Sequence, residues 1–201
     1  MYRISKFQEI KLKKLATLVE EKSKLVNITA IQDFDGIWEK HILDSLEFLN
    51  TDFFKSHQNE KLVYMDLGTG AGFPGLPLAM KIPNSKFFLV DSTRKKIDIV
   101  SFFVKELEIE NAQAVWSRAE DIGEKYDVVL ARAVKYLPEL LTLALAFVKN
   151  DGFIVSYKML NKEEIKSGDD VCKNLKLKKI EEHRYKLSGQ DRVILVYQKY
   201  S

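Results

Sequence analysis

The sequence predicts one α/β domain, with a mainly parallel sheet that closes in an antiparallel hairpin and a cap of helices at its N-terminus. From residue 61 onward, short apolar runs of strand length alternate with segments of helix length and helical spacing. The chain has 201 residues, enough for one well-buried domain and too few for two. Hydrophobic residues make up 46% and charged residues 30%, which is typical of a soluble globular protein and not of a disordered or collagen-like one. We expect the cap to span residues 1–60 and the α/β core residues 61–201 of this single domain.

The cap should consist of two amphipathic helices. Residues 4–26 place apolar side chains at helical spacing between lysines and glutamates, which predicts a helix with one solvated face. Its lysines could contact RNA, but the interleaved glutamates favour a plain solvated face. A second helix is expected over residues 34–49, with Trp38, Ile42 and Leu46 on one side.

The core should begin with five strands. The apolar runs that predict them are residues 62–66, 86–91, 112–116, 126–131 and 153–157. Helical segments at 75–82, 94–107 and 137–148 lie between them, so the strands should be parallel and covered on both faces. Such βαβ units have right-handed crossovers.

The last part of the chain breaks this alternation. A polar helix near residues 161–174 leads into strand-like runs at 175–185 and 192–199, separated by Ser188-Gly189-Gln190-Asp191. Two strands joined by a short polar turn with a glycine form an antiparallel hairpin. The sheet should therefore be mainly parallel and have seven strands, with an antiparallel C-terminal hairpin.

Charge and cysteine content bound the function only loosely. The net charge of +3 is too small to indicate a nucleic-acid partner by itself. Cys172 is the only cysteine, which excludes an intrachain disulfide and a cysteine-rich metal site, and we expect no bound metal. The N-terminus has no apolar signal core, and the most apolar stretch, 136–148, is interrupted by Pro138 and Glu139. We therefore expect a cytoplasmic protein without membrane contacts, and we take a monomer as the simplest oligomeric state.

Residues 65–77 have the pattern of a cofactor loop. A strand runs into Gly68, Gly70 and Gly72, and a helical segment follows directly. Glycines at such a turn can adopt positive φ and let the backbone approach a ligand, while the helix presents unpaired N–H groups. Gly70 to Gly75 also satisfies the dinucleotide pattern G-x-G-x-x-G, so the loop alone leaves a dinucleotide and S-adenosylmethionine open.

Two carboxylates at strand ends narrow the choice of ligand. Asp66 precedes Gly68 by two residues, and at about 4 Å and a dielectric of about 20 it would oppose a pyrophosphate by roughly 4 kcal/mol. The same charge attracts the amino group of S-adenosylmethionine, whose carboxylate the loop N–H groups can receive. Asp91 ends the second strand and should hold ribose hydroxyls, which both nucleotide ligands require, or else it only caps the next helix.

Five motifs in order give the chain a specific resemblance. They are residues 26–31 with 40–45 (Lys-His-Ile-Leu-Asp-Ser), 66–77, 91–96, 117–120 and 130–133. Together they resemble the RsmG family, also called GidB, whose members methylate N7 of a guanine in 16S ribosomal RNA. The resemblance implies a Rossmann-like class I methyltransferase fold, S-adenosylmethionine as cofactor with S-adenosylhomocysteine as product, and the guanine-527 site. The chain departs from the family at Lys40, where arginine is usual, and at Met159, where glycine is usual, which puts a close approach of backbone to RNA in doubt there.

The resemblance and the residues together give a set of cofactor contacts. By resemblance, cofactor contacts are Gly68, Phe73, Ala119, Glu120 and Arg132, and from the loop and strand ends we add Asp66, Gly70, Gly72 and Asp91. Guanine N7 carries a free lone pair, so methyl transfer needs no proton removal and no catalytic base. Proximity and in-line orientation can then supply the catalysis.

Substrate contacts should lie beside the carboxyl ends of the strands, where such sheets bind ligands. The basic candidates are Lys40, His41, Arg94, Lys95, Arg118, Arg132 and Lys158. Most have a structural alternative. His41 can be a packed histidine, and Arg94 and Lys95 can form the solvated start of a helix. Arg118 and Arg132 can pair with Glu120 or Asp121. The expected partner is 16S rRNA or the 30S subunit. A non-catalytic protein that senses S-adenosylmethionine or binds RNA on the same fold is the alternative.

Overall fold

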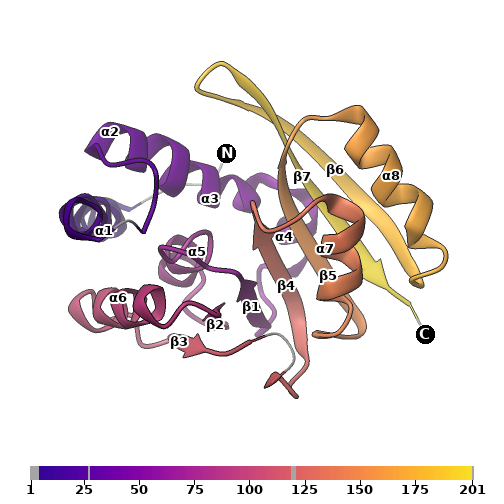
Figure 1. Cartoon of the computed structure of the whole chain (residues 1–201), viewed down its shortest axis with the longest axis horizontal. Coiled ribbons are helices and arrows are strands. Elements are labelled where there is room, and N and C mark those ends of the chain that lie inside the picture. Colours follow the sequence, from indigo (N-terminus) through magenta and orange to yellow (C-terminus); the bar gives the residue numbers. More distant parts are fainter. Residues whose placement is uncertain (1–4, 27, 119–120, 201) are drawn as a thin grey trace.

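A seven-stranded sheet runs through the part of the chain that this computed structural model describes, residues 5–26, 28–118 and 121–200. Its strand order is β3-β2-β1-β4-β5-β7-β6 (Figure 1). The strands are β1 (Val63–Leu67), β2 (Lys86–Asp91), β3 (Ala112–Trp116), β4 (Tyr126–Arg132), β5 (Val148–Met159), β6 (Leu177–Leu187) and β7 (Gln190–Lys199). Strands β1 to β5 are parallel, while β7 is antiparallel to both β5 and β6. The predicted mixed sheet is confirmed, with β6 at its edge and β7 between β5 and β6.

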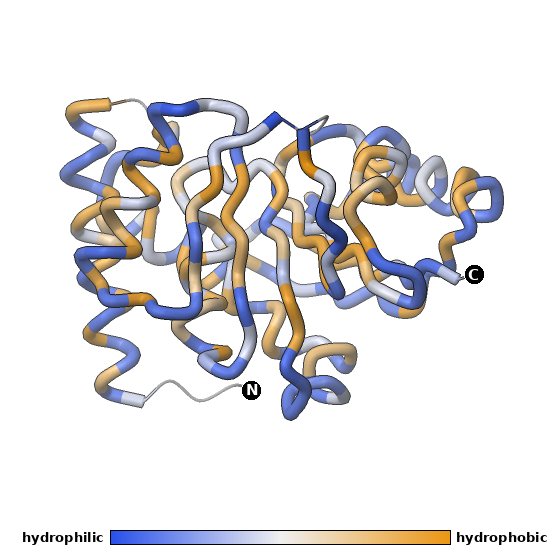
Figure 2. The backbone as a smooth tube through the Cα atoms, turned by 90° about the horizontal axis from the view of Figure 1, so that it is seen from below, coloured by the Kyte–Doolittle hydropathy of each residue, from blue (hydrophilic) through white to orange (hydrophobic). Residues whose placement is uncertain are grey.

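Helices cover both faces of the sheet. Those of the core are α5 (Gly75–Lys81), α6 (Arg94–Glu106), α7 (Leu137–Ala144) and α8 (Lys162–Cys172). Helices α5 and α6 share one hydrophobic core with the cap, and α7 and α8 share the other (Figure 1). Side chains alternate along β4, since Val128 and Leu130 enter the first core and Val129 and Ala131 the second. Figure 2 shows hydrophobic segments along the strands and hydrophilic segments at the turns between them.

Helix α1 (Lys6–Leu25) is the amphipathic helix that the first residues predict. It begins at a capping box, in which the Ser5 hydroxyl accepts a hydrogen bond from the Gln8 amide N–H at 3.2 Å. Leu12, Leu15 and Val19 are fully buried, in the same core as residues of α5 and α6. The cap is thus built onto one face of the sheet.

The second cap helix is not the single element that its apolar spacing predicts. Residues 34–50 divide into α2 (Phe34–Ile37), the π-helix η1 (Trp38–Leu43), α3 (Asp44–Leu46) and the 3₁₀-helix η2 (Glu47–Asn50). A π-turn shifts the helical register, and such turns are frequent at functional sites. Asp44 and Ser45, polar members of the predicted pattern, are fully buried.

Three other elements differ from the sequence prediction. Helix α7 ends at Ala144, and residue 148, predicted to be its last residue, instead begins β5. Helix α4 (Asp52–His57) was not predicted; it is short, and the Thr51 hydroxyl caps it by accepting a hydrogen bond from the Phe54 amide at 3.1 Å. Strand β5 begins five residues earlier than the predicted 153, at Val148, because it continues through a bulge around Asp151, whose φ is 61°. The polar residues of that bulge look like a loop in the sequence. Across the described ranges, no helix has both the length and the hydropathy that crossing a bilayer requires.

Candidate cofactor and substrate site

The glycine loop folds tightly over the end of β1. Gly68, Gly70 and Gly72 all have positive φ, at 71°, 59° and 94°. A Cβ atom on Gly72 would lie 2.3 Å from a methyl carbon of Leu76 at the start of α5. The loop therefore requires glycine both for its backbone conformation and for its close approach to the helix.

Asp66 lies beneath this loop and is fully buried. Its Oδ2 accepts hydrogen bonds from the Thr69 hydroxyl at 2.6 Å and from the Gly75 amide at 2.8 Å. Its Oδ1 has no hydrogen-bond partner among the described residues. Burial raises the pKa of this carboxyl to about 6, so it is still mainly ionised at neutral pH. The carboxylate thus shapes the loop, and only Oδ1 is left for the predicted ammonium group.

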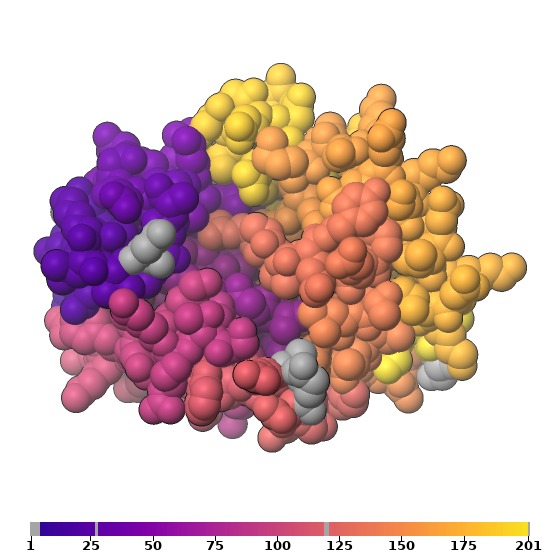
Figure 3. All heavy atoms as spheres, viewed as in Figure 1, coloured from indigo at the N-terminus to yellow at the C-terminus, as the bar shows by residue number. Residues whose placement is uncertain are grey.

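Two adjoining clefts open at the carboxyl ends of the strands. The cap-side cleft has a volume of about 240 Å³ and includes His41, Phe73 and Arg132 in its lining. The β2-side cleft has a volume of about 300 Å³ and includes Asp91. Gly68 and Lys96 line both, so the two form one elongated site across the glycine loop. Figure 3 shows this face of the molecule hollowed between the indigo cap and the pink and orange segments.

Asp91 connects the glycine loop to the β2-side cleft. Its Oδ2 accepts a hydrogen bond from the Gly70 amide at 3.1 Å, and its Oδ1 accepts one from the Thr93 amide at 2.8 Å. The Lys96 ammonium lies 3.9 Å from Oδ2. Asp91 therefore both orders the start of α6 and lines the cleft, so the role of a helix cap does not prevent it from binding ribose. The sequence pattern gave Lys96 no place in the site.

The wall of the cap-side cleft is an interlocked set of three side chains. Arg132 donates from Nη1 to Asp44 Oδ2 at 3.0 Å, and its Nη2 lies 3.2 Å from His41 Nδ1. His41 stacks on the Phe73 ring with centroids 4.8 Å apart, and the Arg132 guanidinium lies 5.5 Å from the same ring. Among the described residues the ionic partner of Arg132 is Asp44 and not Asp121, which the structural alternative had named together with Glu120; Glu120 lies outside the described residues.

Asp44 is the buried anion that holds this wall together. It lies between Arg132 of β4 and Arg192 of β7, whose Nε is 3.0 Å from Asp44 Oδ1. Tyr185 of β6 donates its hydroxyl to the same Oδ1 at 2.7 Å. A charged group without exposure is held in a protein only with such partners. Sequence reasoning missed this role, because the partners come from three strands that lie far from Asp44 in the sequence.

His41 is a neutral, packed histidine in the wall of the cleft. Burial, followed by the charge of Arg132, lowers its pKa to about 3. An arginine can only donate, so Nδ1 accepts from Arg132 and Nε2 carries the proton toward the Thr29 hydroxyl, 2.7 Å away. His41 is thus the packed, hydrogen-bonded histidine of the structural alternative, and its ring also lines the cap-side cleft; a contact with substrate stays a prediction.

Lys158 has intramolecular partners. Its ammonium lies 2.7 Å from Glu164 of α8, contacts the Lys135 carbonyl oxygen, and its side chain is only 10% exposed. Glu164 also accepts a hydrogen bond from the Leu137 amide at the start of α7, at 2.9 Å. The pair anchors α7 and α8 to β5, which is a structural role that the sequence pattern did not suggest.

The other basic candidates lie on the surface. Arg94 pairs with Asp98 at 3.2 Å and lies over the ring of Trp116. Lys40, Lys95 and Arg118 are exposed. Two predicted cofactor contacts, Ala119 and Glu120, lie outside the described residues. In the described ranges, no cluster of three or more His, Cys, Asp or Glu side chains could hold a metal ion.

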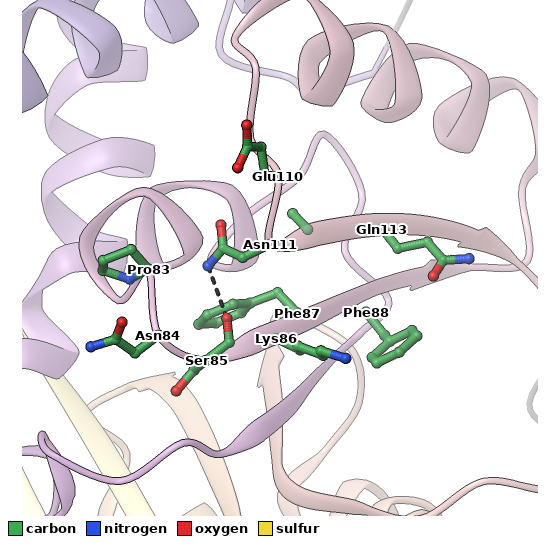
Figure 4. A pocket seen from close by; sticks show the side chains of 10 residues that line it. Pro83, Asn84, Ser85, Lys86, Phe87, Phe88, Glu110, Asn111 and Gln113 are labelled. Atoms are coloured by element: carbon green, nitrogen blue, oxygen red, sulfur yellow. Dashed lines mark hydrogen bonds between the residues drawn. The ribbon is translucent and has the colours of Figure 1, made fainter.

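A larger hollow of about 460 Å³ lies at the opposite edge of the sheet, at the amino ends of β2 and β3. Its lining includes Phe87, Phe88 and Asn111 (Figure 4). The Asn111 amide donates to the carbonyl oxygens of Ala79, Ile82 and Ser85 at 2.9 to 3.1 Å, so it ties neighbouring turns together. Ligands of parallel sheets bind at the other edge, which is where the glycine loop lies.

The fold and the site define a Rossmann-like methyltransferase. A solved methyltransferase from Pyrococcus furiosus superposes with a TM-score of 0.64, covering 78% of this chain and 83% of that chain at 16% identity, which speaks for the fold. The chain belongs to the GidB family, rRNA small subunit methyltransferase G, whose model matches residues 8–194. The methyltransferase G of Fusobacterium nucleatum is 38% identical over 193 residues, 93% of this chain and 81% of the relative. The methyltransferase G of Mesoplasma florum is 36% identical over 188 residues, which are 90% of this chain and 77% of the relative. The predicted family is confirmed.

Proposed function

We propose that this protein transfers a methyl group from S-adenosylmethionine to N7 of a guanine in 16S rRNA, at the guanine-527 site. The observation that carries the proposal is the family match over residues 8–194, which includes both clefts and the glycine loop between them. A Rossmann-like methyltransferase fold with a glycine loop at the carboxyl edge of the sheet supports it.

The site offers a complementary group for each part of the cofactor. The amides of Gly68, Gly70 and Gly72 would receive the carboxylate, and Asp66 Oδ1 would attract the amino group. Asp91 would bind the ribose hydroxyls, and the far end of the β2-side cleft would take the adenine. A pyrophosphate at the same loop would meet the buried Asp66 carboxylate, which disfavours a dinucleotide. Phe73, Ala119, Glu120 and Arg132 stay predicted cofactor contacts.

The cap-side cleft would hold the guanine. Phe73, His41 and Arg132 present an aromatic and planar wall, which suits the flat face of a base. Because N7 has no proton to lose, the neutral His41 is not required as a base, and catalysis follows from holding N7 in line with the methyl group. Exposed Lys40, Lys95 and Arg118 are proposed phosphate contacts, and Lys158 is the least available of the candidates. We also propose a cytoplasmic monomer whose partner is 16S rRNA or the 30S subunit.

The deciding experiment is methylation with labelled S-adenosylmethionine. Small subunits and protein-free 16S rRNA, both lacking the modification, are incubated separately with the protein, and the modified base is mapped by reverse transcription. We expect label in at least one substrate, at a single guanine, and markedly less label with Asp91→Ala when S-adenosylmethionine is limiting. Cofactor binding without label in either substrate would overturn the enzyme assignment and favour the non-catalytic alternative.

A further inference from the structure

Trp116 is a large aromatic side chain held exposed at the carboxyl end of β3. It is 54% exposed, although aromatic rings are usually buried in a domain of this size. Its indole N–H donates to the Ser92 carbonyl oxygen at 3.0 Å, which fixes the ring beside the first residue after β2. In the sheet, Trp116 pairs with Asp91, so the ring lies at the rim of the proposed adenosine site.

One cation lies against this ring, and two exposed basic residues lie close to it in the sequence. The Arg94 guanidinium lies 5.0 Å from the indole centroid and is itself held by Asp98 at 3.2 Å. Lys95 and Arg118, the neighbours in sequence of Arg94 and Ser117, are exposed on the same rim. A preorganised aromatic ring with cations beside it is the arrangement that proteins use for single-stranded nucleic acids.

We propose that Trp116 and Arg94 form a platform on which an unpaired base of the RNA substrate, next to the target guanine, stacks. The exposed Lys95 and Arg118 would contact the phosphates on either side. This inference rests on the proposed function, because it takes RNA as the substrate. It adds a second contact region, on the opposite side of the cofactor from the cap.

The geometry favours RNA over the cofactor as the occupant. The β2-side cleft is lined by Ser92, Thr93 and Ser117, while the Trp116 side chain reaches the Ser92 carbonyl and is not part of the described lining. Its side chain belongs to the face of Ala112 and Ala114, which pack with the first core, whereas Val115 and the cleft residues Ile122 and Leu143 pack with the second. The ring therefore offers its exposed surface outward.

Tryptophan fluorescence tests the platform. Trp38 and Trp116 are the two tryptophans of the chain, so Trp38→Phe leaves Trp116 as the sole reporter. The probe is an unstructured, mixed-sequence RNA of about eight nucleotides, a length within the usual range of such sites. Its affinity is also measured by anisotropy for Trp116→Ala, for Trp116→Phe, and for the control Phe102→Ala. Phe102 is another exposed ring, within the C-terminal half of α6, with the Lys22 ammonium 4.3 Å from its centroid, and α6 leads away from the carboxyl edge of the sheet.

We expect RNA to quench Trp116 fluorescence and Trp116→Ala to weaken binding about tenfold, the equivalent of about 1.4 kcal/mol of stacking. Trp116→Phe should keep most of the affinity and Phe102→Ala all of it. RNA binding that leaves both Trp116 fluorescence and the affinity of Trp116→Ala unchanged would overturn the platform. Quenching by S-adenosylhomocysteine alone would assign the ring to the cofactor and overturn it as well.

Methylation by the wild-type protein separates this inference from the proposed function. If the wild type methylates rRNA and Trp116→Ala has an unchanged KM for RNA, only the platform fails. If RNA quenches Trp116 but no RNA is methylated, only the proposed reaction fails. If no RNA binds the wild type, both fail.

Discussion

The two sides of the site are built in opposite ways. On the cap side, Asp44 and Arg132 are almost excluded from solvent, and the carboxylate is shared by two arginines and a tyrosine from three strands. On the β3 side, Arg94 and Asp98 form an ion pair in which both side chains are more than 60% exposed, beside an exposed indole. Buried charges hold one geometry because losing a partner is costly, whereas exposed pairs rearrange at little cost. The cap side is therefore suited to orient the reacting base, and the β3 side to accept a flexible chain.

The strongest test of this contrast compares two aspartates. Asp44→Ala leaves Arg132 and Arg192 as largely buried cations without their carboxylate, and we expect the free energy of unfolding to fall by about 3–5 kcal/mol. Asp98→Ala removes the exposed partner of Arg94 and should change it by less than about 1 kcal/mol. Urea denaturation of both variants measures the difference. Equal effects would mean that the cap side is not held by its buried charges.

Asp66 is a buried carboxylate whose Oδ1 has no hydrogen-bond partner among residues 5–26, 28–118 and 121–200, in contrast to the fully partnered Asp44. Its pKa is raised to about 6 in the folded protein, so folding is favoured while it is protonated, and this stability is lost as pH rises from about 4 through 6. This pKa shift lowers the free energy of unfolding by roughly 3 kcal/mol between acid pH, where the carboxyl is protonated, and neutral pH. Asp66→Asn should remove it, so the stability of the variant relative to the wild type should increase with pH over that range. A constant difference in urea midpoint between pH about 4 and about 7 would show that the carboxyl titrates normally.

Asp91 tests whether the cleft beside the β3 rim holds the ribose. Asp91→Ala removes the acceptor for the cofactor hydroxyls and should weaken binding of S-adenosylhomocysteine by about tenfold or more, since hydrogen bonds to charged groups contribute about 1.5–3 kcal/mol. Calorimetric titration measures the affinity. The matched control is Asp98→Ala, whose carboxylate points to Arg94 and should leave cofactor affinity unchanged. Unaltered affinity in both variants would remove Asp91 from the cofactor site.

The smallest effect is expected for Arg94. Arg94→Ala loses an exposed ion pair and a cation–π contact, so we expect the free energy of unfolding to change by less than about 1 kcal/mol. Thermal denaturation checks this value. A loss above about 2 kcal/mol would show that the β3 rim, like the cap side, is held together by its charges.

Sequence reasoning succeeded where the signal is local. The glycine loop and the strand before it lie within about fifteen residues, so turn chemistry and strand pattern predict them together. The short apolar runs that form β1 to β4 are bounded by polar residues and were found within a residue or two of their observed ends. The full length of β5 was missed because the bulge at Asp151 resembles a loop.

The charge cluster around Asp44, which supports the wall of the cap-side cleft, could not be predicted in this way. Asp44, Arg132, Tyr185 and Arg192 meet only after the sheet is assembled, and no periodicity connects residues so far apart in sequence. The π-turn over residues 38–43 also turns Asp44 away from the side that a regular helix would give it. A motif that includes Asp44 was visible, but the motif does not say which partners neutralise the carboxylate.

The position of β7 between β5 and β6 has a consequence for folding during synthesis on the ribosome. Synthesis proceeds from the N-terminus, so Asp44 and Arg132 emerge well before Tyr185 and Arg192. A nascent chain that ends after β5 therefore contains Asp44 and only one of its two arginine partners, Arg132. Contacts between residues so far apart in sequence also form slowly. Strand β7, which follows β5 and β6 in the chain, completes the charge cluster behind the cap-side cleft, so the proposed guanine site is complete only after the hairpin has been translated.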